Sequence, residues 1–488
     1  MLTVAVIGYL LFTIAIGCLA ARRVHGARDF MVAGRSLPLY MNFACVFATW
    51  FGAETVLSVS ATFAGEGLHA IPGDPFGFSF CLVLVAVFFA KAFYRLDLLT
   101  IGDFYRKRFG KTTEIFTSIV IAMSYLGWAA AQLTALGLLI SVLGQNAGWT
   151  ELRINHGIMI GVLIVAFYTV MGGMWSVALT DMIQTFVIIV GLIVVAFLMA
   201  RAAGGVGVVV ESAHQAGRFD LFPEGGGREV MVFLAGFLTA ALGSIPQQDV
   251  FQRVTSAKDE KTAQRGTLLG GLFYCAFAFV PMFIAYAAIV IDPDHLVQFA
   301  SEDTREVQRA LPAAIIASTP FWAQALFLGA LLSAILSTAS GTLLAPASLL
   351  VENVVRPLAP RMTDRTMLIC LRSVLLVFAA LAAYQAFTSN QTMYEMVEHA
   401  YSITLVGAFA PLAVGLAWRG ATTQGALLSI ATGIVVWLTV HHFAEDFIVP
   451  AQLCGLSASL VAIVLGSLLP EWVGQTPDTT EMMDLARK

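Results

Sequence analysis

The chain has 488 residues, of which 58% are apolar and 12% are charged, and its formal net charge is −4. Its mean hydropathy of +0.83 excludes a soluble globular domain and predicts an all-helical polytopic membrane protein in a lipid bilayer. The small net charge excludes a broad basic face for nucleic acid. The partners that remain are lipid and small molecules.

Thirteen apolar stretches follow one another along the chain, each long enough to cross a membrane as a helix. They cover residues 3–21, 39–65, 76–97, 114–144, 155–172, 175–203, 230–252, 266–291, 320–352, 366–388, 394–418, 423–442 and 448–469. The first stretch is followed by Arg22 and Arg28, the reverse of the charge order in a cleaved signal peptide. We therefore expect an uncleaved first helix with the N-terminus outside.

Charged side chains alternate between the loops in a way that sets the orientation. Basic residues gather in 106–111, 258–265 and 356–365, whereas an intervening loop carries Asp292 and Asp294. Cytoplasmic loops of membrane proteins carry an excess of Lys and Arg. The pattern predicts the N-terminus outside, the C-terminus inside, and residues 471–488 as a cytoplasmic tail.

The second stretch is interrupted at its middle by Thr49, Gly52, Glu54 and Thr55. Irregular backbone at membrane depth is tolerated only where it is buried in protein or lines a cavity. Broken helices of this kind hold ions and solutes in transporters. The alternative is an ordinary membrane helix whose small residues allow close packing.

A second interruption, at residues 241–253, falls five stretches after the first and contains Gly243, Pro246, Gln247 and Gln248. Proline removes a backbone donor and disturbs the preceding turn, which frees carbonyl groups. Two breaks at this spacing predict an inverted repeat of five helices with five helices, whose breaks face each other near the midplane. A simple proline kink is the alternative.

Two further polar features lie at membrane depth. Asp181 opens an apolar helix, where an acid must be paired, lie near an interface or be functional. Hydroxyl groups gather in Ser337, Thr338, Ser340 and Thr342 on a long apolar helix. Asp181 as an anchor at the cytoplasmic interface, and hydroxyls bonded to their own helix, remain open alternatives.

These motifs together resemble the sodium:solute symporter family, which contains sugar, proline, pantothenate and choline symporters. The resemblance rests on Ala-Gly-Arg-Ser-Leu after the first stretch, residues 48–54, Gly172-Gly173 through Asp181, Gln252-Arg253 and residues 334–338. It implies a leucine-transporter-like core. The expected divisions are 1–38, a first helix and loop; 39–203 and 230–418, the two repeats; 204–229, an external loop; 419–470, two additional helices; and 471–488, the tail.

The resemblance also implies sodium sites. The family's common site would use backbone carbonyls of Ala48, Phe51 and Ala334 with the hydroxyls of Ser337 and Thr338. A second sodium, present in some members, would use an acid matching Asp181 and a hydroxyl matching Ser340. The expected coupling ion is therefore sodium.

The solute site is expected around the two breaks. Trp50, Phe78 and Trp128 match aromatic positions of the choline branch, and aromatic rings suit a quaternary ammonium group. Gln247 stands where that branch has tryptophan, and Glu54 matches other branches. Gln248 completes the expected set. Choline-like, proline-like and small organic acid solutes all remain open, as does ordinary packing of the rings.

The sequence thus predicts a sodium-coupled symporter that imports a small organic solute across the cytoplasmic membrane by alternating access. The alternative is a membrane sensor with the same fold. No HExxH, GxSxG, CxxC or Walker pattern occurs at membrane depth, so we do not expect an enzyme. A monomer and a homo-oligomer both remain open.

Overall fold

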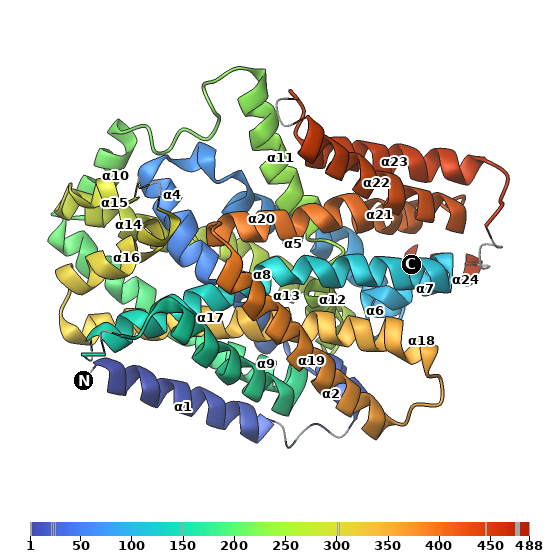
Figure 1. Cartoon of the computed structure of the whole chain (residues 1–488), viewed down its shortest axis with the longest axis horizontal. Coiled ribbons are helices and arrows are strands. Elements are labelled where there is room, and N and C mark those ends of the chain that lie inside the picture. Colours follow the sequence, from blue (N-terminus) through green and yellow to red (C-terminus); the bar gives the residue numbers. More distant parts are fainter. Residues whose placement is uncertain are drawn as a thin grey trace.

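The computed structural model describes residues 2–20, 22, 24, 26–146, 148–149, 151–299, 301, 303–444, 447–473 and 479–487 (Figure 1). Residue 21, at the end of the first expected helix, and residues 474–478 and 488 of the expected tail lie outside this part of the chain.

The described part of the chain is built from helices, with an isolated bridge between Leu37 and Ala257. The longer helices are α1 (Leu2–Ala20), α3 (Leu39–Trp50), α8 (Lys111–Asn146), α9 (Ile154–Ala202), α11 (Gly227–Gly243), α13 (Glu260–Phe277), α14 (Phe279–Ile291), α16 (Thr304–Ser318), α17 (Phe321–Leu350), α19 (Asp364–Thr388), α20 (Met393–Thr404), α22 (Thr423–Phe443) and α23 (Ala451–Leu468). The shorter α-helices are α2 (Ala27–Val32), α4 (Ser60–Gly65), α5 (Phe78–Leu84), α6 (Ala90–Arg95), α7 (Ile101–Phe109), α10 (Val206–Gln215), α12 (Gln248–Ser256), α15 (His295–Phe299), α18 (Arg356–Leu358), α21 (Ala410–Ala417) and α24 (Thr480–Arg487). Tighter or wider turns form η2 (Ala33–Arg35), η3 (Glu54–Val59), η4 (Leu68–Ala70), η5 (Pro72–Gly77), η6 (Val85–Phe89), η7 (Val351–Val355) and η8 (Leu405–Phe409).

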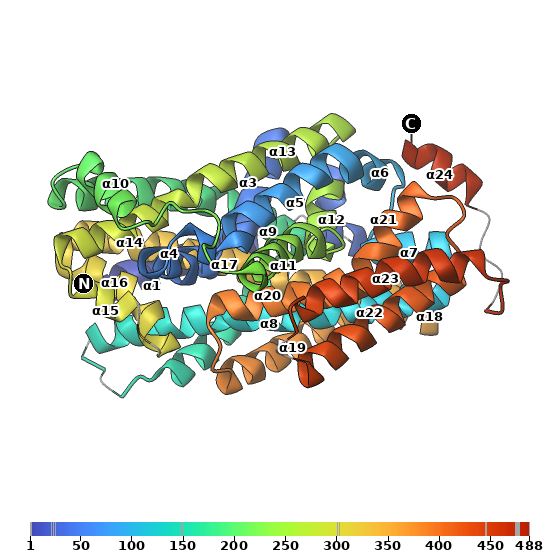
Figure 2. The same ribbon diagram turned by 90° about the horizontal axis from the view of Figure 1, so that it is seen from above.

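The long helices run roughly along one axis, and the connecting segments gather at its two ends (Figures 1 and 2). The basic segments at α7 and α18 lie at the end that also holds α24 and the C-terminus. The segments α10, α15 and α16 lie at the opposite end with the N-terminus. These two basic segments therefore lie at one end of the bundle.

Ten helices of the described chain are long and apolar enough to cross a membrane, or up to twelve if each of two bent pairs is counted as a span. The first pair, Leu39–Trp50 with Glu54–Gly65, is bent by 58°. The second, Gly227–Gly243 with Gln248–Ser256, is bent by 44°. Both helix breaks expected from the sequence are therefore present.

The long helix α9 covers two of the expected spans. A straight helix of its 49 residues would be roughly 74 Å long, more than twice the hydrocarbon thickness. Its backbone leaves the helical conformation at Gly173, where φ is 52° and ψ is −144°. The interruption falls between the expected spans 155–172 and 175–203, because only glycine adopts this backbone without strain.

The sequence missed several helices that lie outside the expected spans. The clearest is α16, which lies in a stretch expected to be a loop. Its Ala310, Leu311, Ala314 and Ile315 are buried against the bundle at helical spacing, while the rest of the helix is more polar. A search for continuous apolar stretches overlooks such an amphipathic helix.

The centre of the bundle is α17, in which 94% of the residues in the most apolar segment are buried. The corresponding fraction is 22% for the peripheral α1. The hydroxyl cluster therefore lies on the most enclosed helix, where each polar group needs a partner.

Candidate functional site at the two helix breaks

The first break begins where α3 ends at Trp50. Phe51 leaves the helical conformation with φ −85° and ψ 77°. Gly52 follows, and a side chain there would lie 2.3 Å from a carboxylate oxygen of Glu54. Any larger residue at position 52 would therefore require the Glu54 carboxylate, which folds back over the break, to move.

The hydroxyl cluster of α17 meets this break directly. Ser337 Oγ donates to the carbonyl oxygen of Ala48 at 2.8 Å and to that of Ala334 at 3.0 Å. Thr338 Oγ1 lies 3.3 Å from Ala48 O and 3.2 Å from Thr49 O. Neighbouring side chains on a helix point about 100° apart, and here both reach Ala48 O.

Four of the five residues expected at the common sodium site are thus in contact with one another. The fifth, Phe51, lies three residues after Ala48 in the same break. Sequence reasoning did not include Thr49, whose carbonyl accepts from Thr338. The residues supply hydroxyl and carbonyl oxygens, which are the ligands of sodium sites in broken helices.

The residues expected at a second sodium site lie nearby. Asp181 is fully buried within α9, so it neither caps the helix nor reaches the surface. Both of its carboxylate oxygens lack a hydrogen-bond partner among the described residues. Ser340 Oγ donates to Ser337 O at 2.9 Å. The hydroxyl bonds of Ser340 and Thr342 to their own helix also match the alternative of back-bonding.

The three expected aromatic residues form one cluster. The Trp50 ring lies 5.0 Å from that of Phe78 and 6.0 Å from that of Trp128, measured between centroids. Tyr401 was not predicted, yet its ring stacks on Trp50 at 6.0 Å and lies 5.1 Å from Phe78 and 5.5 Å from Trp128. Tyr125 extends the cluster through Trp128 at 6.1 Å. These five aromatic side chains are called the aromatic cluster below.

Glu54 lies beside this cluster and is almost fully buried. Its carboxylate accepts from Trp128 Nε1 at 3.1 Å and from the Gln132 amide. Gln132 also accepts from the backbone of Ala53 at 3.2 Å, so it holds the start of η3 in place. Glu54 thus fixes the orientation of an aromatic ring and places a carboxyl group beside it.

A second buried acid, Asp74, lies next to the same segment. Its carboxylate accepts from Thr55 Oγ1 at 2.8 Å and from the Tyr274 hydroxyl. Both of its oxygens are therefore bonded. Sequence reasoning missed Asp74, because its partners Thr55 and Tyr274 can be identified only in the folded chain.

The second break places its two glutamines differently. Gln247 Nε2 donates to Ser124 Oγ at 3.0 Å and to Thr404 Oγ1 at 3.3 Å, next to the aromatic cluster. Gln248 Oε1 instead accepts from the backbone of Ile101 at 2.8 Å, at the start of α7. Only Gln247 is brought together with the expected aromatic residues.

Arg253 joins the two breaks. Its Nε donates to Thr49 Oγ1 at 2.8 Å, and its Nη1 lies 3.5 Å from the backbone oxygen of Asp249. A side chain at Gly341 would lie 2.7 Å from Nη2, so the guanidinium occupies the space above that glycine on α17. Arg253 of the sequence motif therefore links α12 with α3 and α17.

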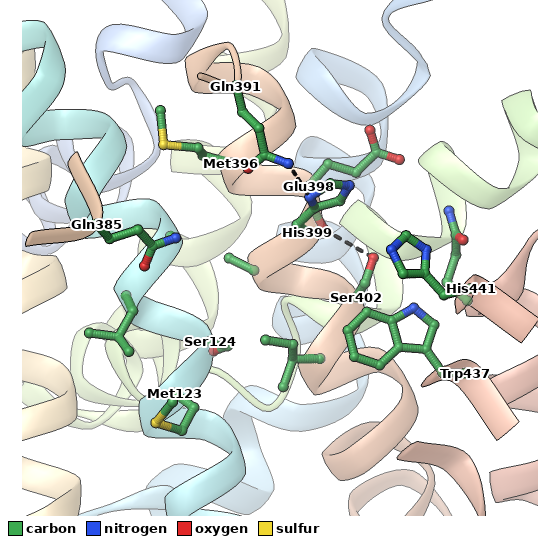
Figure 3. A pocket seen from close by; sticks show the side chains of 15 residues that line it. Met123, Ser124, Gln385, Gln391, Met396, Glu398, His399, Ser402, Trp437 and His441 are labelled. Atoms are coloured by element: carbon green, nitrogen blue, oxygen red, sulfur yellow. Dashed lines mark hydrogen bonds between the residues drawn. The ribbon is translucent and has the colours of Figure 1, made fainter. Parts of the chain in front are cut away.

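A separate cavity of about 410 Å³ lies on the outer side of α8, between α19, α20, α22 and α23 (Figure 3). His399 and His441 approach each other from α20 and α22, and Trp437 lies below them (Figure 3). Ser124 also lines this cavity and accepts from Gln247. The Ser124 hydroxyl therefore joins the lining of this cavity to Gln247 of the second break by a hydrogen bond.

Known transporters are similar to this chain over most of its length. The human high affinity choline transporter 1 is 28% identical over 455 residues, which cover 89% of this chain and 76% of the transporter. The osmoregulated proline transporter OpuE of Bacillus subtilis is 24% identical over 489 residues, 94% of this chain and 93% of the transporter. The chain itself is a multi-pass membrane protein, with ten to twelve candidate spans in its described part.

Solved structures share the fold. A Na⁺-coupled sialic acid symporter in its substrate-bound outward-open state superposes with a TM-score of 0.80 and 18% identity, covering 97% of this chain and 99% of that one. Mhp1, a nucleobase-cation-symport-1 family transporter in a closed conformation, gives a TM-score of 0.59 and 14% identity, covering 93% and 98%.

The sodium:solute symporter family model matches residues 30–433, which include both breaks, the hydroxyl cluster and the aromatic cluster. The chain therefore belongs to the sodium:solute symporter family.

Proposed function

We propose that the chain couples sodium movement to the uptake of a small organic solute by alternating access. The observation that carries the proposal is the contact between the Ser337 and Thr338 hydroxyls and the carbonyls of the first break. An ion held there would join α3 to α17. Each sodium moving inward would also gain roughly 2.3 kcal/mol per 100 mV of membrane potential.

The sodium ligands of the common site would be the carbonyls of Ala48, Phe51 and Ala334 with the two hydroxyls. The donor set is neutral and consists of oxygen only, which suits a hard monovalent cation. Asp181 and Ser340 would hold a second sodium, supported by the two unbonded carboxylate oxygens of Asp181.

The solute would lie against the aromatic cluster, with Trp50 as its principal contact. The proposed binding residues are Trp50, Phe78, Trp128, Glu54 and Gln247. Gln248 would contribute from the start of α12, where its side chain bonds to the backbone of Ile101 in α7. Buried acids outnumber buried bases around the breaks of the described chain, where Glu54, Asp74, Asp181 and Asp249 are buried with the base Arg253. This excess of acidic groups supports a solute with a positively charged nitrogen over an organic acid, because a nearby cation favours the ionised form of a buried carboxyl group.

The thirteen-span topology is also a proposal. It counts each bent pair as one span and divides α9 at Gly173 into two. The repeats would cover 39–203 and 230–418, with the helix before 38 and the two helices of 419–470 outside them. The N-terminus would be external, and the protein would lie in the cytoplasmic membrane.

Uptake into proteoliposomes tests the function. Labelled choline, proline, ethanolamine and lactate are supplied with an inward sodium gradient, with equal sodium on both sides, or with a proton gradient alone. We expect one class of solute to accumulate only under the sodium gradient. Equal accumulation without sodium would refute sodium coupling. Saturable binding without accumulation of any solute would indicate a sensor instead.

A further inference from the structure

Four buried polar atoms beside the aromatic cluster lack a hydrogen-bond partner among the described residues: Ser244 Oγ, Gln247 Oε1, Asp249 Oδ2 and Tyr401 OH. Their side chains come from α20 and from the second break, so the fold brings together residues that are far apart in the sequence. Buried polar groups in native proteins are almost always bonded to protein, water or ligand. A cluster of such atoms at a proposed solute site therefore describes the chemistry of its occupant.

The carboxylate of Asp249 is held firmly in this place. The Tyr125 hydroxyl donates to Asp249 Oδ1 and accepts from the Asp249 backbone N–H at 2.8 Å. Tyr125 belongs to the aromatic cluster through Trp128. Asp249 also lies within electrostatic reach of the Tyr401 hydroxyl. Its second oxygen, Oδ2, is buried and unbonded within the described chain.

Favourable charge at the start of α12 is the simplest alternative role for Asp249, since acids stabilise the first turn of a helix. That role does not explain the bond to Tyr125 or the unbonded Oδ2. Arg253 lies within electrostatic reach of the carboxylate but gives no hydrogen bond to Oδ2 among the described residues, because its guanidinium bonds to Thr49 Oγ1 and to the backbone oxygen of Asp249.

The hydrogen bonds around Gln247 fix which amide atom is free. Ser124 donates its proton to Ile121 O at 2.7 Å, and Thr404 donates to Gly243 O at 2.7 Å. Both hydroxyls can therefore only accept from Gln247, which requires the amide nitrogen to face them. The free atom is Oε1, a pure acceptor like Asp249 Oδ2.

Two pure acceptors, one of them a carboxylate oxygen, call for an occupant that is a cation and a hydrogen-bond donor. A quaternary ammonium group carries the charge but has no N–H group, and a solute carboxylate would be repelled. We propose that the solute carries an ammonium group with N–H donors, and that Asp249 and Gln247 select for it beside the aromatic cluster. This inference rests on the proposed function, because it names the solute of the same site.

The N–H ammonium group is common to simple amines and to amino acids, so the experiment separates them. Binding to purified protein in sodium is measured by the change in tryptophan fluorescence for ethanolamine, its N-methyl and N,N-dimethyl derivatives, choline, proline and lactate. The first four differ by stepwise replacement of N–H groups with methyl groups. A simple-amine site prefers ethanolamine to proline, and an amino-acid site shows the reverse.

We expect affinity to fall along the methylation series, with choline weaker than ethanolamine by about tenfold or more, since hydrogen bonds to charged groups are worth that much in affinity. Asp249→Asn should reduce this difference to about twofold. The matched control is Asp74→Asn, another buried acid near the break, whose two oxygens are bonded within the protein. That variant should keep the wild-type order of the series.

Choline binding as tight as ethanolamine binding in the wild type would overturn the inference, and this arm does not depend on any variant folding. An unchanged series in a folded Asp249→Asn variant would overturn it as well. Sodium-driven uptake of choline or lactate, but of no amine, would leave the proposed function standing and refute the inference. Amine binding that weakens along the methylation series, without sodium-driven uptake of any solute, would support the inference and refute the proposed function.

Discussion

At the scale of single residues, Trp50 occupies the most connected position of the proposed solute site. Its ring contacts Phe78, Trp128 and Tyr401 and stacks nearly parallel to Tyr401, with an interplanar angle of 11°. A solute that enters the cluster must lie against this ring or move it. The consequences of replacing it therefore separate solute binding from simple packing.

We expect Trp50→Ala to raise the solute concentration for half-maximal uptake, with Trp50→Phe less harmful. Cation-π and stacking contacts are worth about 0.5 to 2 kcal/mol, or roughly two- to thirtyfold in affinity, and any aromatic ring restores part of this. Uptake kinetics and surface expression of both variants provide the measurement. Equal losses in both variants at normal expression would indicate a packing role.

Gln247→Trp tests whether the solute site is arranged as in the choline branch, which has tryptophan at this position. The substitution removes the amide next to the aromatic cluster and adds an indole, so it should shift preference toward quaternary ammonium solutes. Competition between choline and ethanolamine for uptake gives the ratio, which we expect to move toward choline by about tenfold. A ratio equal to that of the wild type would argue against Gln247 as a determinant of selectivity.

The sequence predicted the residues whose types match a known motif and missed those defined only by packing. Ser337, Thr338, Ala48 and Ala334 were expected together and lie together. Tyr401 and Asp249 could not be found in the same way, because a lone tyrosine or acid has no pattern until α8, α12 and α20 are placed side by side. Gln248 was expected beside the solute, yet its bond partner is Ile101 of α7.

At the scale of elements, the joint between α3 and α17 is the part of the fold on which coupling would depend. The hydroxyls of α17 reach carbonyls that α3 exposes only because the helix ends at Trp50. The breaks were predictable from Gly52 and Pro246. The bend angles and the partner helix were not, since they follow from tertiary packing.

Ser337→Ala and Thr338→Ala should raise the sodium concentration for half-maximal uptake by roughly fivefold or more, because each removes one oxygen ligand. Solute affinity at saturating sodium should change little. The control is Thr342→Ala, since Thr342 Oγ1 bonds to the Ala339 carbonyl of its own helix. Sodium titration of uptake provides the measurement. Unchanged sodium dependence in the first two variants would contradict the site.

The short helix α7 is anchored by Arg108. Its guanidinium donates to the backbone oxygens of Gly415, Trp418 and Arg419 at 3.0 to 3.2 Å. Burial lowers the pKa of Arg108 to about 10, so the group remains charged at neutral pH. The anchor ties the basic end of the bundle to the segment that follows α21.

Arg108→Lys should lower thermal stability, because one ammonium group cannot span three carbonyls and leaves buried acceptors unbonded, at a cost of about 1 to 3 kcal/mol. The neighbouring exposed Lys107→Arg change serves as the control and should have little effect. Melting of the purified protein in detergent gives the comparison. Identical melting temperatures for both variants would contradict the anchoring role.

At the scale of the whole molecule, the two ends of the bundle differ in charge, and this difference carries the proposed orientation. The hydropathy pattern predicted nearly every long helix. It could not predict α10, α15 and α16 at the opposite end, because amphipathic helices on the surface lack a continuous apolar stretch. Because Gly173 alone separates two expected spans within α9, the number of spans depends on the backbone conformation of one glycine.

Cysteine labelling in intact cells tests the orientation. In a background with the native cysteines replaced by alanine, Asp294→Cys should react with an impermeant thiol reagent, and Lys258→Cys should react only after permeabilisation. The expectation follows from the excess of basic residues in cytoplasmic loops. Labelling of position 258 in intact cells would refute the proposed topology.

The contact between the Trp50 ring and the three rings around it has an electrical consequence. Trp50, Phe78, Trp128 and Tyr401 already contact one another, and we expect them also to close the route across the centre of the bundle. Sodium would find no water-filled route past them while no solute is present. The protein should therefore show negligible leak conductance at rest, and shortening one ring, as in Tyr401→Ala, would turn a tightly coupled carrier into one that dissipates the gradient it depends on.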